Sequence, residues 1–352
     1  MHPVQPFQQF LIWKLLGRGV QLSSITWEDY GRRLWDFARF LHANGLAWNE
    51  PVYELGKSVV ARYRDWSVSE LTLSAKTVNG RLRLIVDFYE WAHTRELIDR
   101  LPFDYADVRV PQFDRLLMHV DEGERTVGRP NIMLREWTAM PEFLTSDQIR
   151  IVRALPLSPT RRLLFELMVR VGLRSVEART FPLRYVFNPA TRRDCAPDRM
   201  IRLRLDPRHI HTKFGKARDV DVPYSLMSDL YSYTLYERNR LVNGASQQHR
   251  ASLLLTTHGM SFSKDAVAET FRTVSALAGF RVTALMLRHT YAIYTLARLR
   301  ANPDYTGEPL LYLRDRLGHE NVQTTAVYLA QIEQLAGATV LSIADEYEVL
   351  FA

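Results

Sequence analysis

Cysteine is almost absent from this sequence of 352 residues, since Cys195 is the only one. A single cysteine excludes an internal disulfide bond and any zinc or iron–sulfur site built on several cysteines. Long apolar runs are also missing, because no stretch approaches the roughly 18 uncharged apolar residues that span a bilayer. The N-terminal FLIWKLL is short and contains Lys14, so it is a poor signal peptide. We therefore expect a cytoplasmic protein without a membrane partner.

Lysine is the second scarce residue. Only 6 of the 46 basic residues are lysines and the other 40 are arginines, and the formal net charge is +7 with a pI near 9.5. A basic balance favours a polyanionic partner, and arginine binds phosphate oxygens with two donors at once. Many basic proteins bind no polyanion, however, and high arginine can also reflect genomic base composition. The position of each lysine is therefore more informative than the net charge.

The apolar pattern predicts mostly helix in residues 1–110. Helical spacing is clear over 24–45 and over 74–97. The second of these segments contains Lys76, Asn79, Arg81 and Arg83 on its early turns. These polar side chains are candidates for DNA contacts, and the alternative is an ordinary solvated helix face.

A turn-rich stretch over 111–141, without a clear period, predicts a linker. Order resumes where Thr145 and Gln148 have the spacing of a helix capping box. Residues 200–222 alternate apolar and polar side chains, which predicts short antiparallel strands. The sequence therefore predicts a mainly α fold with a small antiparallel β-sheet in its C-terminal domain.

Four motifs follow one another between 172 and 331, and each alone has a structural interpretation. GLRSVEART places Arg174 after a helix stop, HTKFGKARDVDVP places two of the six lysines on one turn, and TALMLRHTYAIY places an arginine in an apolar helix. The fourth, LGHENVQTTAVYLAQ, places His319 nine residues before Tyr328. The alternatives are ion-pair partners, a solvated turn and a core aromatic side chain. A buried arginine is costly unless it is paired, so a substrate phosphate is a plausible partner for the third motif.

Together, in this order and spacing, the motifs resemble the tyrosine recombinase (phage integrase) family over about 142–335, and residues 1–110 resemble its helical core-binding domain loosely. The resemblance implies a two-domain DNA clamp with a linker at 111–141, a catalytic domain at 142–335 and a tail at 336–352 that could dock onto a neighbouring protomer. It also implies double-stranded DNA as partner, a homo-tetramer on two DNA sites, and no cofactor or metal. A metal site at His209 and His211 lacks a third ligand.

The resemblance also assigns roles to individual residues. Arg218 and Pro223 give the register of the lysine turn. The implied catalytic residues are Arg174, Lys213, Arg288, His319 and Tyr328, the supporting residues are Glu177 and His289, and Lys216 and Arg218 are further DNA-binding candidates.

One position departs from the family's usual His-x-x-Arg, because Leu285 stands where the first histidine is expected. Leucine can neither donate a hydrogen bond nor carry a proton, and we expect it to fill the core.

The implied activity is site-specific DNA recombination through a 3′-phosphotyrosine, without metal or ATP. A phenol suits the nucleophile, two arginines suit the charge that builds at phosphorus, and a turn lysine suits the acid that protonates the leaving 5′-oxygen. Two alternatives remain. Leu285 keeps open a weakened family member that binds its site as an accessory protein, and a type IB topoisomerase would use the same nucleophile and arginines.

Overall fold

The computed structural model of the chain describes residues 5–17, 24–50, 57–109, 126–137 and 140–334. The chain forms two compact units, unit 1 (Met1–Thr138) and unit 2 (Ala139–Ala352). The fold is mainly helical with small antiparallel sheets, as predicted from the sequence. Among the described residues, no helix is both long and apolar enough to cross a bilayer.

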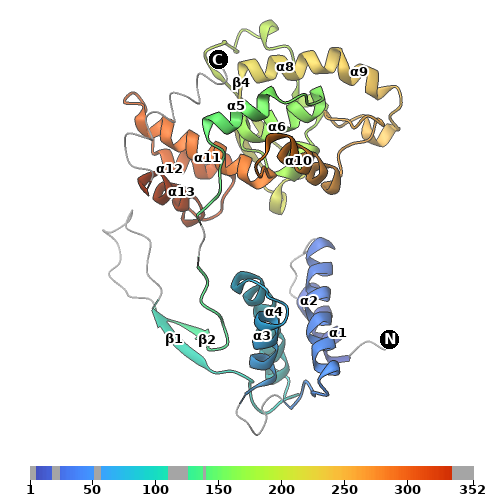
Figure 1. The fold of residues 1–352 in the computed structure, drawn as a ribbon, viewed down its shortest axis with the longest axis vertical. Coiled ribbons are helices and arrows are strands. Elements are labelled where there is room, and N and C mark those ends of the chain that lie inside the picture. The colour runs from blue at the N-terminus through green and yellow to red at the C-terminus, as the bar shows by residue number, and fades with distance from the viewer. Residues whose placement is uncertain (1–4, 18–23, 51–56, 110–125, 138–139, 335–352) are drawn as a thin grey trace. The chain divides into compact units, whose positions relative to one another are not determined.

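Unit 1 is a helical bundle followed by a β-hairpin, and α4 packs against each of the other three helices, α1, α2 and α3 (Figure 1). Its core is rich in aromatic rings. Phe10, Phe37 and Phe88 are fully buried, and the rings of Phe37 and Tyr63 lie 5.1 Å apart in an edge-to-face arrangement. Each such burial contributes about 1.5–3 kcal/mol. The elements are α1 (Gln5–Leu16), α2 (Ser24–Ala43), α3 (Val59–Ser69), α4 (Ala75–Thr94), β1 (Tyr105–Arg109) and β2 (Thr126–Pro130).

The described part of the predicted linker is not a linker. Strand β2 pairs with β1 in antiparallel register, with Tyr105 opposite Pro130. The segment after β2 packs on unit 1, where Ile132 is buried in the core. Turn-rich composition concealed this hairpin, because its partner strand lies on the other side of residues 110–125. Residues 110–125 and 138–139 lie outside the described residues.

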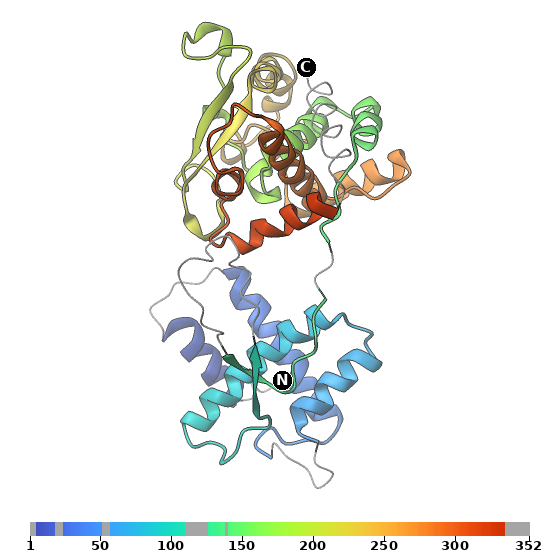
Figure 2. The same cartoon turned by 90° about the vertical axis from the view of Figure 1, so that its left-hand side faces the viewer.

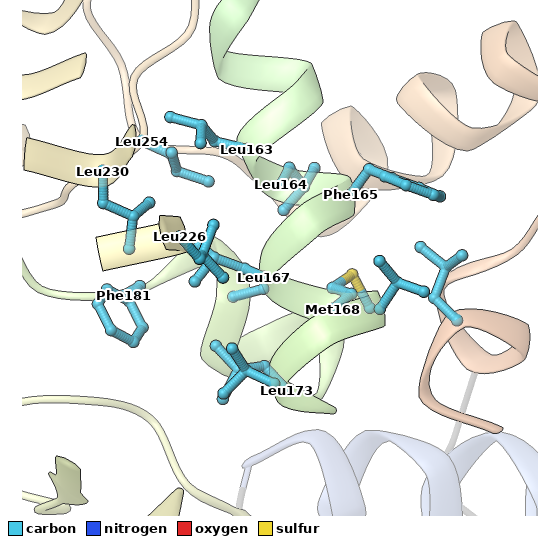
Figure 3. Close-up of a cluster of buried hydrophobic side chains, with 14 of the residues drawn as sticks. Leu163, Leu164, Phe165, Leu167, Met168, Leu173, Phe181, Leu226, Leu230 and Leu254 are labelled. Atoms are coloured by element: carbon cyan, nitrogen blue, oxygen red, sulfur yellow. The ribbon is translucent and has the colours of Figure 1, made fainter. Parts of the chain in front are cut away.

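Unit 2 is built around α6, whose side chains are buried almost all round. Figure 3 shows Leu163, Leu167 and Met168 of this helix, which belong to the same buried cluster as Leu226 and Leu230 of α8. The elements are α5 (Ser146–Ala154), α6 (Pro159–Val171), α7 (Ser175–Arg179), η2 (Leu183–Tyr185), η3 (Pro189–Thr191), β3 (Met200–Leu205), η4 (Lys213–Gly215), β4 (Arg218–Pro223), α8 (Tyr224–Leu235), α9 (Glu237–Val242), η5 (Gln247–His249), α10 (Lys264–Ala278), α11 (Ala284–Ala301), α12 (Pro309–Leu317) and α13 (Gln323–Gln334).

Local signals set the helix ends of unit 2. The predicted capping box at α5 is present, with the Thr145 hydroxyl accepting from the Gln148 N–H and the Gln148 side chain accepting from the Thr145 N–H. Helix α6 ends at Gly172 in the left-handed conformation, at φ 68°. A Cβ at Gly172 would lie 2.3 Å from Cδ1 of Tyr291. Glycine is therefore required there both for the backbone turn and for the close approach of α11.

The predicted strands form the β3–β4 ribbon, coloured olive and yellow in Figure 2. They are antiparallel, with Leu205 opposite Arg218. The turn that joins β3 and β4 contains Lys213 and Lys216, so both lysines lie at one end of the ribbon. Strand β4 packs on α6 and α12 and holds the ribbon in place. His209 and His211 follow β3 rather than lying on a strand face, and His209 contacts Arg184.

Candidate active site

Arg174 and Glu177 lie where the chain turns from α6 into α7. Arg174 is the N-cap of α7. One Glu177 oxygen accepts from the Arg174 backbone N–H at 2.7 Å, and the other accepts from Arg174 Nη1 at 3.1 Å. Arg174 Nη2 donates to the Gly318 carbonyl at 3.0 Å. The arginine is thus oriented from both sides by residues far apart in the sequence.

Arg218 is buried beneath this pair and is not free to contact DNA, which corrects the sequence interpretation. Its guanidinium donates to Glu177 and to the Arg316 carbonyl. Burial lowers the pKa of Arg218, and the Glu177 carboxylate opposes that shift. Arg218, Val220 and Val222 occupy every second position of β4 and therefore face the same side of the strand. The two valines could have shown from the sequence that Arg218 points inward.

Glu177 has no exposed surface. Burial favours its neutral form, but Arg218 and Arg174 outweigh burial, so the pKa of Glu177 is lowered and the carboxylate is charged. One carboxylate therefore stands among three arginines, because Arg288 also acts on it. The cluster keeps an excess of positive charge.

Arg288 is buried on α11 and spans two helix ends. Its Nη1 donates to the Gly172 carbonyl at 2.6 Å, and its Nη2 donates to the Leu317 carbonyl at 2.5 Å. These carbonyls belong to the C-termini of α6 and α12, where a cation is favourable. Burial, with the charges of Arg174 and Arg218, lowers the pKa of Arg288.

His319 follows the left-handed Gly318 that ends α12. Its Nδ1 lies 2.9 Å from the Thr325 hydroxyl, and its Nε2 lies 3.4 Å from Nη2 of Arg288. Burial, reinforced by the charge of Arg288, lowers the pKa of His319 to about 3, so the imidazole is neutral near pH 7. Thr325 was not predicted as a site residue, and it lies one turn before Tyr328 on α13.

Tyr328 lies on α13, with its side chain directed at α11. It is 3% exposed, and its hydroxyl oxygen lies 2.8 Å from Nδ1 of His289. Burial raises the pKa of Tyr328, and Arg288 and Arg174 oppose that shift. Burial, with the charge of Arg288, lowers the pKa of His289 to about 4.

Lys213 and Lys216 are both exposed on the turn of the ribbon. Lys213 lines a cleft together with Arg174, Gly318 and His319, and its Nζ lies 4.7 Å from the ring centroid of Phe214. Lys216 lines the same cleft and pairs with Glu320 at 2.5 Å. Lys213 therefore lies among the predicted catalytic residues, while Lys216 is engaged at the rim.

Leu285 does not fill the core, which corrects the second expectation. It lies on the first turn of α11 and is 62% exposed. Core filling was predicted because α11 is apolar elsewhere, but on its first turn Met286 and Leu287 are buried in the core and Leu285 faces outward.

The DNA candidates of unit 1 differ in their availability. Asn79 is fully buried, and its side chain bonds the Leu134 N–H and carbonyl and also Glu136. Arg81 is mostly buried against Asp36 at 2.5 Å. Arg83 is exposed and pairs with Glu136 at 2.7 Å, and Lys76 is exposed.

Asn79 is thus a structural residue, which corrects its assignment, whereas Lys76 and Arg83 lie on the surface. The structure brings together Arg174, Lys213, Arg288, His319 and Tyr328 around one site of unit 2, with Glu177 beneath them and His289 against the tyrosine. In the ranges that the structure describes, no group of three or more His, Cys, Asp or Glu side chains is arranged to hold a metal ion.

Comparisons with known proteins give a match over part of unit 1 and the fold of the chain. Residues 6–96 match the model of the phage integrase N-terminal SAM-like domain. A search of curated protein sequences finds no match. Among solved structures, XerH recombinase in a post-cleavage complex with the palindromic difH substrate has a TM-score of 0.58 at 17% identity, covering 88% of this chain and 77% of its own.

Two further structures cover 92% of this chain and 94% of their own. They are a lambda integrase dimer on a COC′ core site, with a TM-score of 0.58 at 15% identity, and the Tn1549 transposon integrase with circular intermediate DNA, with a TM-score of 0.55 at 16% identity. The chain therefore has the fold of these recombinase and integrase structures, and its residues 6–96 are similar to the phage integrase N-terminal SAM-like domain.

Proposed function

We propose that this protein is a site-specific DNA recombinase that cuts and rejoins DNA strands through a 3′-phosphotyrosine on Tyr328. The observation that carries the proposal is the arrangement of Arg174, Arg288 and His319 around one site, with the Tyr328 hydroxyl on the adjoining face of α11. Neither metal nor ATP is needed, because the phosphotyrosine stores the energy of the broken phosphodiester bond.

The guanidinium groups of Arg174 and Arg288 would neutralise the two non-bridging oxygens of the scissile phosphate. Both are held by carbonyls or a carboxylate, so their positions are fixed before DNA arrives, and little free energy is spent on ordering them. Neutral His319 would donate a hydrogen bond to the same phosphate. Lys213 would protonate the leaving 5′-oxygen from its exposed turn.

Double-stranded DNA is the proposed partner, and a homo-tetramer on two DNA sites is the proposed working assembly. The solved XerH, lambda integrase and Tn1549 integrase structures contain DNA, and the excess of arginine in this chain suits phosphate contacts. Unit 1 would bind DNA through exposed cations such as Lys76 and Arg83. The docking role of 336–352 remains a prediction, because residues 335–352 lie outside the described part of the chain.

The test is the formation of a covalent protein–DNA adduct. The purified protein would be incubated with nicked suicide DNA from the locus flanking its own gene, and denaturing gels would be scored for adduct. We expect an adduct that the Tyr328→Phe variant does not form while it still binds the DNA. An adduct that survives this substitution would contradict the assignment of the nucleophile.

A second candidate is a site-binding accessory protein that cuts poorly. Leu285 favours it, because an exposed leucine at the start of α11 can contribute neither a hydrogen bond nor a proton to a bound phosphate. Specific DNA binding without adduct, together with adduct formation by Leu285→His, would favour this candidate. Relaxation of a plasmid that lacks a specific site would instead favour topoisomerase activity.

A further inference from the structure

A nucleophilic phenol must lose its proton as it attacks phosphorus, and the residues assigned so far do not accept it. Glu177 is occupied by Arg174 and Arg218. His319 has its two ring nitrogens beside Thr325 and Arg288. The group that contacts the Tyr328 hydroxyl is His289, whose Nδ1 lies 2.8 Å from the hydroxyl oxygen.

We propose that His289 is a catalytic residue and that its Nδ1 is the base that takes the proton of the Tyr328 hydroxyl. The inference rests on the proposed function. A distance of 2.8 Å is within the reach that proton transfer requires. The ring of His289 is tilted by 54° to that of Tyr328 with centroids 5.5 Å apart, so the rings are not stacked in parallel and Nδ1 contacts the hydroxyl.

The position on α11 explains why His289 can do this and residue 285 does not. His289 follows directly after Arg288, which is held by two carbonyls, so the backbone of this turn is fixed. His289 is half-buried and faces α13, whereas Leu285, one turn earlier, is exposed. The base is thus supplied from the turn of α11 that contacts the nucleophile.

The step balances in protons and bonds. The O–H bond of Tyr328 breaks as the proton passes to Nδ1 of His289. The phenol oxygen bonds to phosphorus, the bond from phosphorus to the 5′-oxygen breaks, and that oxygen takes a proton from Lys213. Religation reverses each transfer, with the imidazolium returning its proton to the tyrosine oxygen.

The surroundings keep His289 unprotonated before cleavage, although they also oppose the imidazolium form. Burial and the Arg288 charge hold it neutral near pH 7. A bound phosphate would place negative charge beside Arg288 and Arg174, which removes part of the repulsion felt by an imidazolium. Proton transfer therefore becomes easier when substrate is in place.

The experiment compares His289→Asn, His289→Ala and wild type in single-turnover cleavage of the suicide DNA. Asparagine places a polar atom near the position of Nδ1 and keeps a hydrogen bond to Tyr328, but it is not basic. Neither asparagine nor alanine can accept the proton, so both variants should cleave about 100- to 10,000-fold more slowly than wild type. Both variants should still bind DNA. His258→Asn, the same change at an exposed histidine of unit 2, is the matched control and should cleave at the wild-type rate.

A substrate with a 5′-bridging sulfur separates the two proton transfers. A thiolate leaves without protonation, so this substrate should restore cleavage by Lys213→Ala but not by His289→Asn. If His289→Asn cleaves like wild type while His289→Ala is slow, the histidine only positions the tyrosine and the proposal is overturned.

Folding of each variant would be checked by thermal unfolding. If His289→Asn does not fold, His289→Ala with added imidazole replaces it. Cleavage that rises with imidazole concentration would support the proposal, and cleavage that does not rise would overturn it. Failure of the proposed function would be seen in the wild type itself, which would then form no adduct that depends on Tyr328. In that case the inference on His289 would also be overturned.

Discussion

Substitution of Glu177 by glutamine should destabilise unit 2 more than any change to an exposed ion pair. The carboxylate is fully buried and accepts from the Arg174 N–H, from Arg174 Nη1 and from Arg218. Glutamine keeps the volume but replaces one acceptor oxygen by an NH₂ donor that faces other donors. It also removes the negative charge that Arg218 and Arg288 share.

The magnitude follows from burial. Removing one partner of a buried ion pair costs about 3–5 kcal/mol, because the remaining charge stays desolvated and unpaired. The side chain of Arg218 is 6% exposed, so water cannot replace the carboxylate. With a urea m-value of about 2 kcal/mol per molar, the unfolding midpoint of unit 2 should fall by about 2 M.

The loss should depend on pH in a defined direction. Burial raises the pKa of Glu177, but the lowering by Arg218 and Arg174 is larger. The pKa of Glu177 in the folded state is therefore below the unfolded value. Its contribution is therefore present above the unfolded pKa of about 4.3 and is lost as the pH falls through the folded pKa. The difference between wild type and Glu177→Gln should shrink in acid.

The distribution of tryptophan makes the assay specific. All seven tryptophans lie between Trp13 and Trp137, within unit 1, so their fluorescence reports on that unit alone. Unfolding of unit 2 would be followed by far-UV circular dichroism and compared with the tryptophan signal in the same urea series. Glu320→Gln removes the exposed partner of Lys216 in the same unit and is the matched control.

We expect Glu177→Gln to shift the circular dichroism midpoint and Glu320→Gln to shift it little. An equal effect of both variants, or a loss below about 1 kcal/mol for Glu177→Gln, would refute the reasoning, because it would mean that the buried arginines are stable without a counter-charge.

Three further predictions concern single positions. Gly318→Ala should cost about 1–2 kcal/mol in unit 2, measured by urea unfolding, because φ is 62° there and the new Cβ would lie 2.7 Å from Cδ of Arg218; unchanged stability would contradict this. Asn79→Ala should cost about 1–3 kcal/mol in the tryptophan-monitored transition of unit 1, because it leaves the Leu134 N–H without its acceptor and removes the hydrogen bond from a buried side chain to Glu136, and DNA affinity of the folded variant should be retained. Leu285→Ala should change the free energy of unfolding of unit 2 by less than about 0.5 kcal/mol, because the side chain is exposed. A larger loss of stability would show that Leu285 packs in the folded protein.

The sequence by itself determined the local features of this protein. The capping box of Thr145 and Gln148 and the helix stop at Gly172 depend on residues a few positions apart, so short patterns predicted them. Alternation over 200–222 predicted the β3–β4 ribbon for the same reason. The order and spacing of the four motifs resembled those of tyrosine recombinases before any contact was known, and the structure has the fold of such proteins, while the roles of the motif residues are a proposal.

Only the tertiary structure decided which of these side chains are available. The Asn79 side chain donates a hydrogen bond to the carbonyl of Leu134, 55 residues away. The Arg218 guanidinium donates one to the carbonyl of Arg316, 98 residues away. Leu285 is exposed because it lies on the outward side of the first turn of α11, whereas Met286 and Leu287 of the same turn are buried in the core. The contact of His289 with the tyrosine likewise depends on how α11 packs on α13. Burial is set by partners distant in the sequence, and no local pattern contains them.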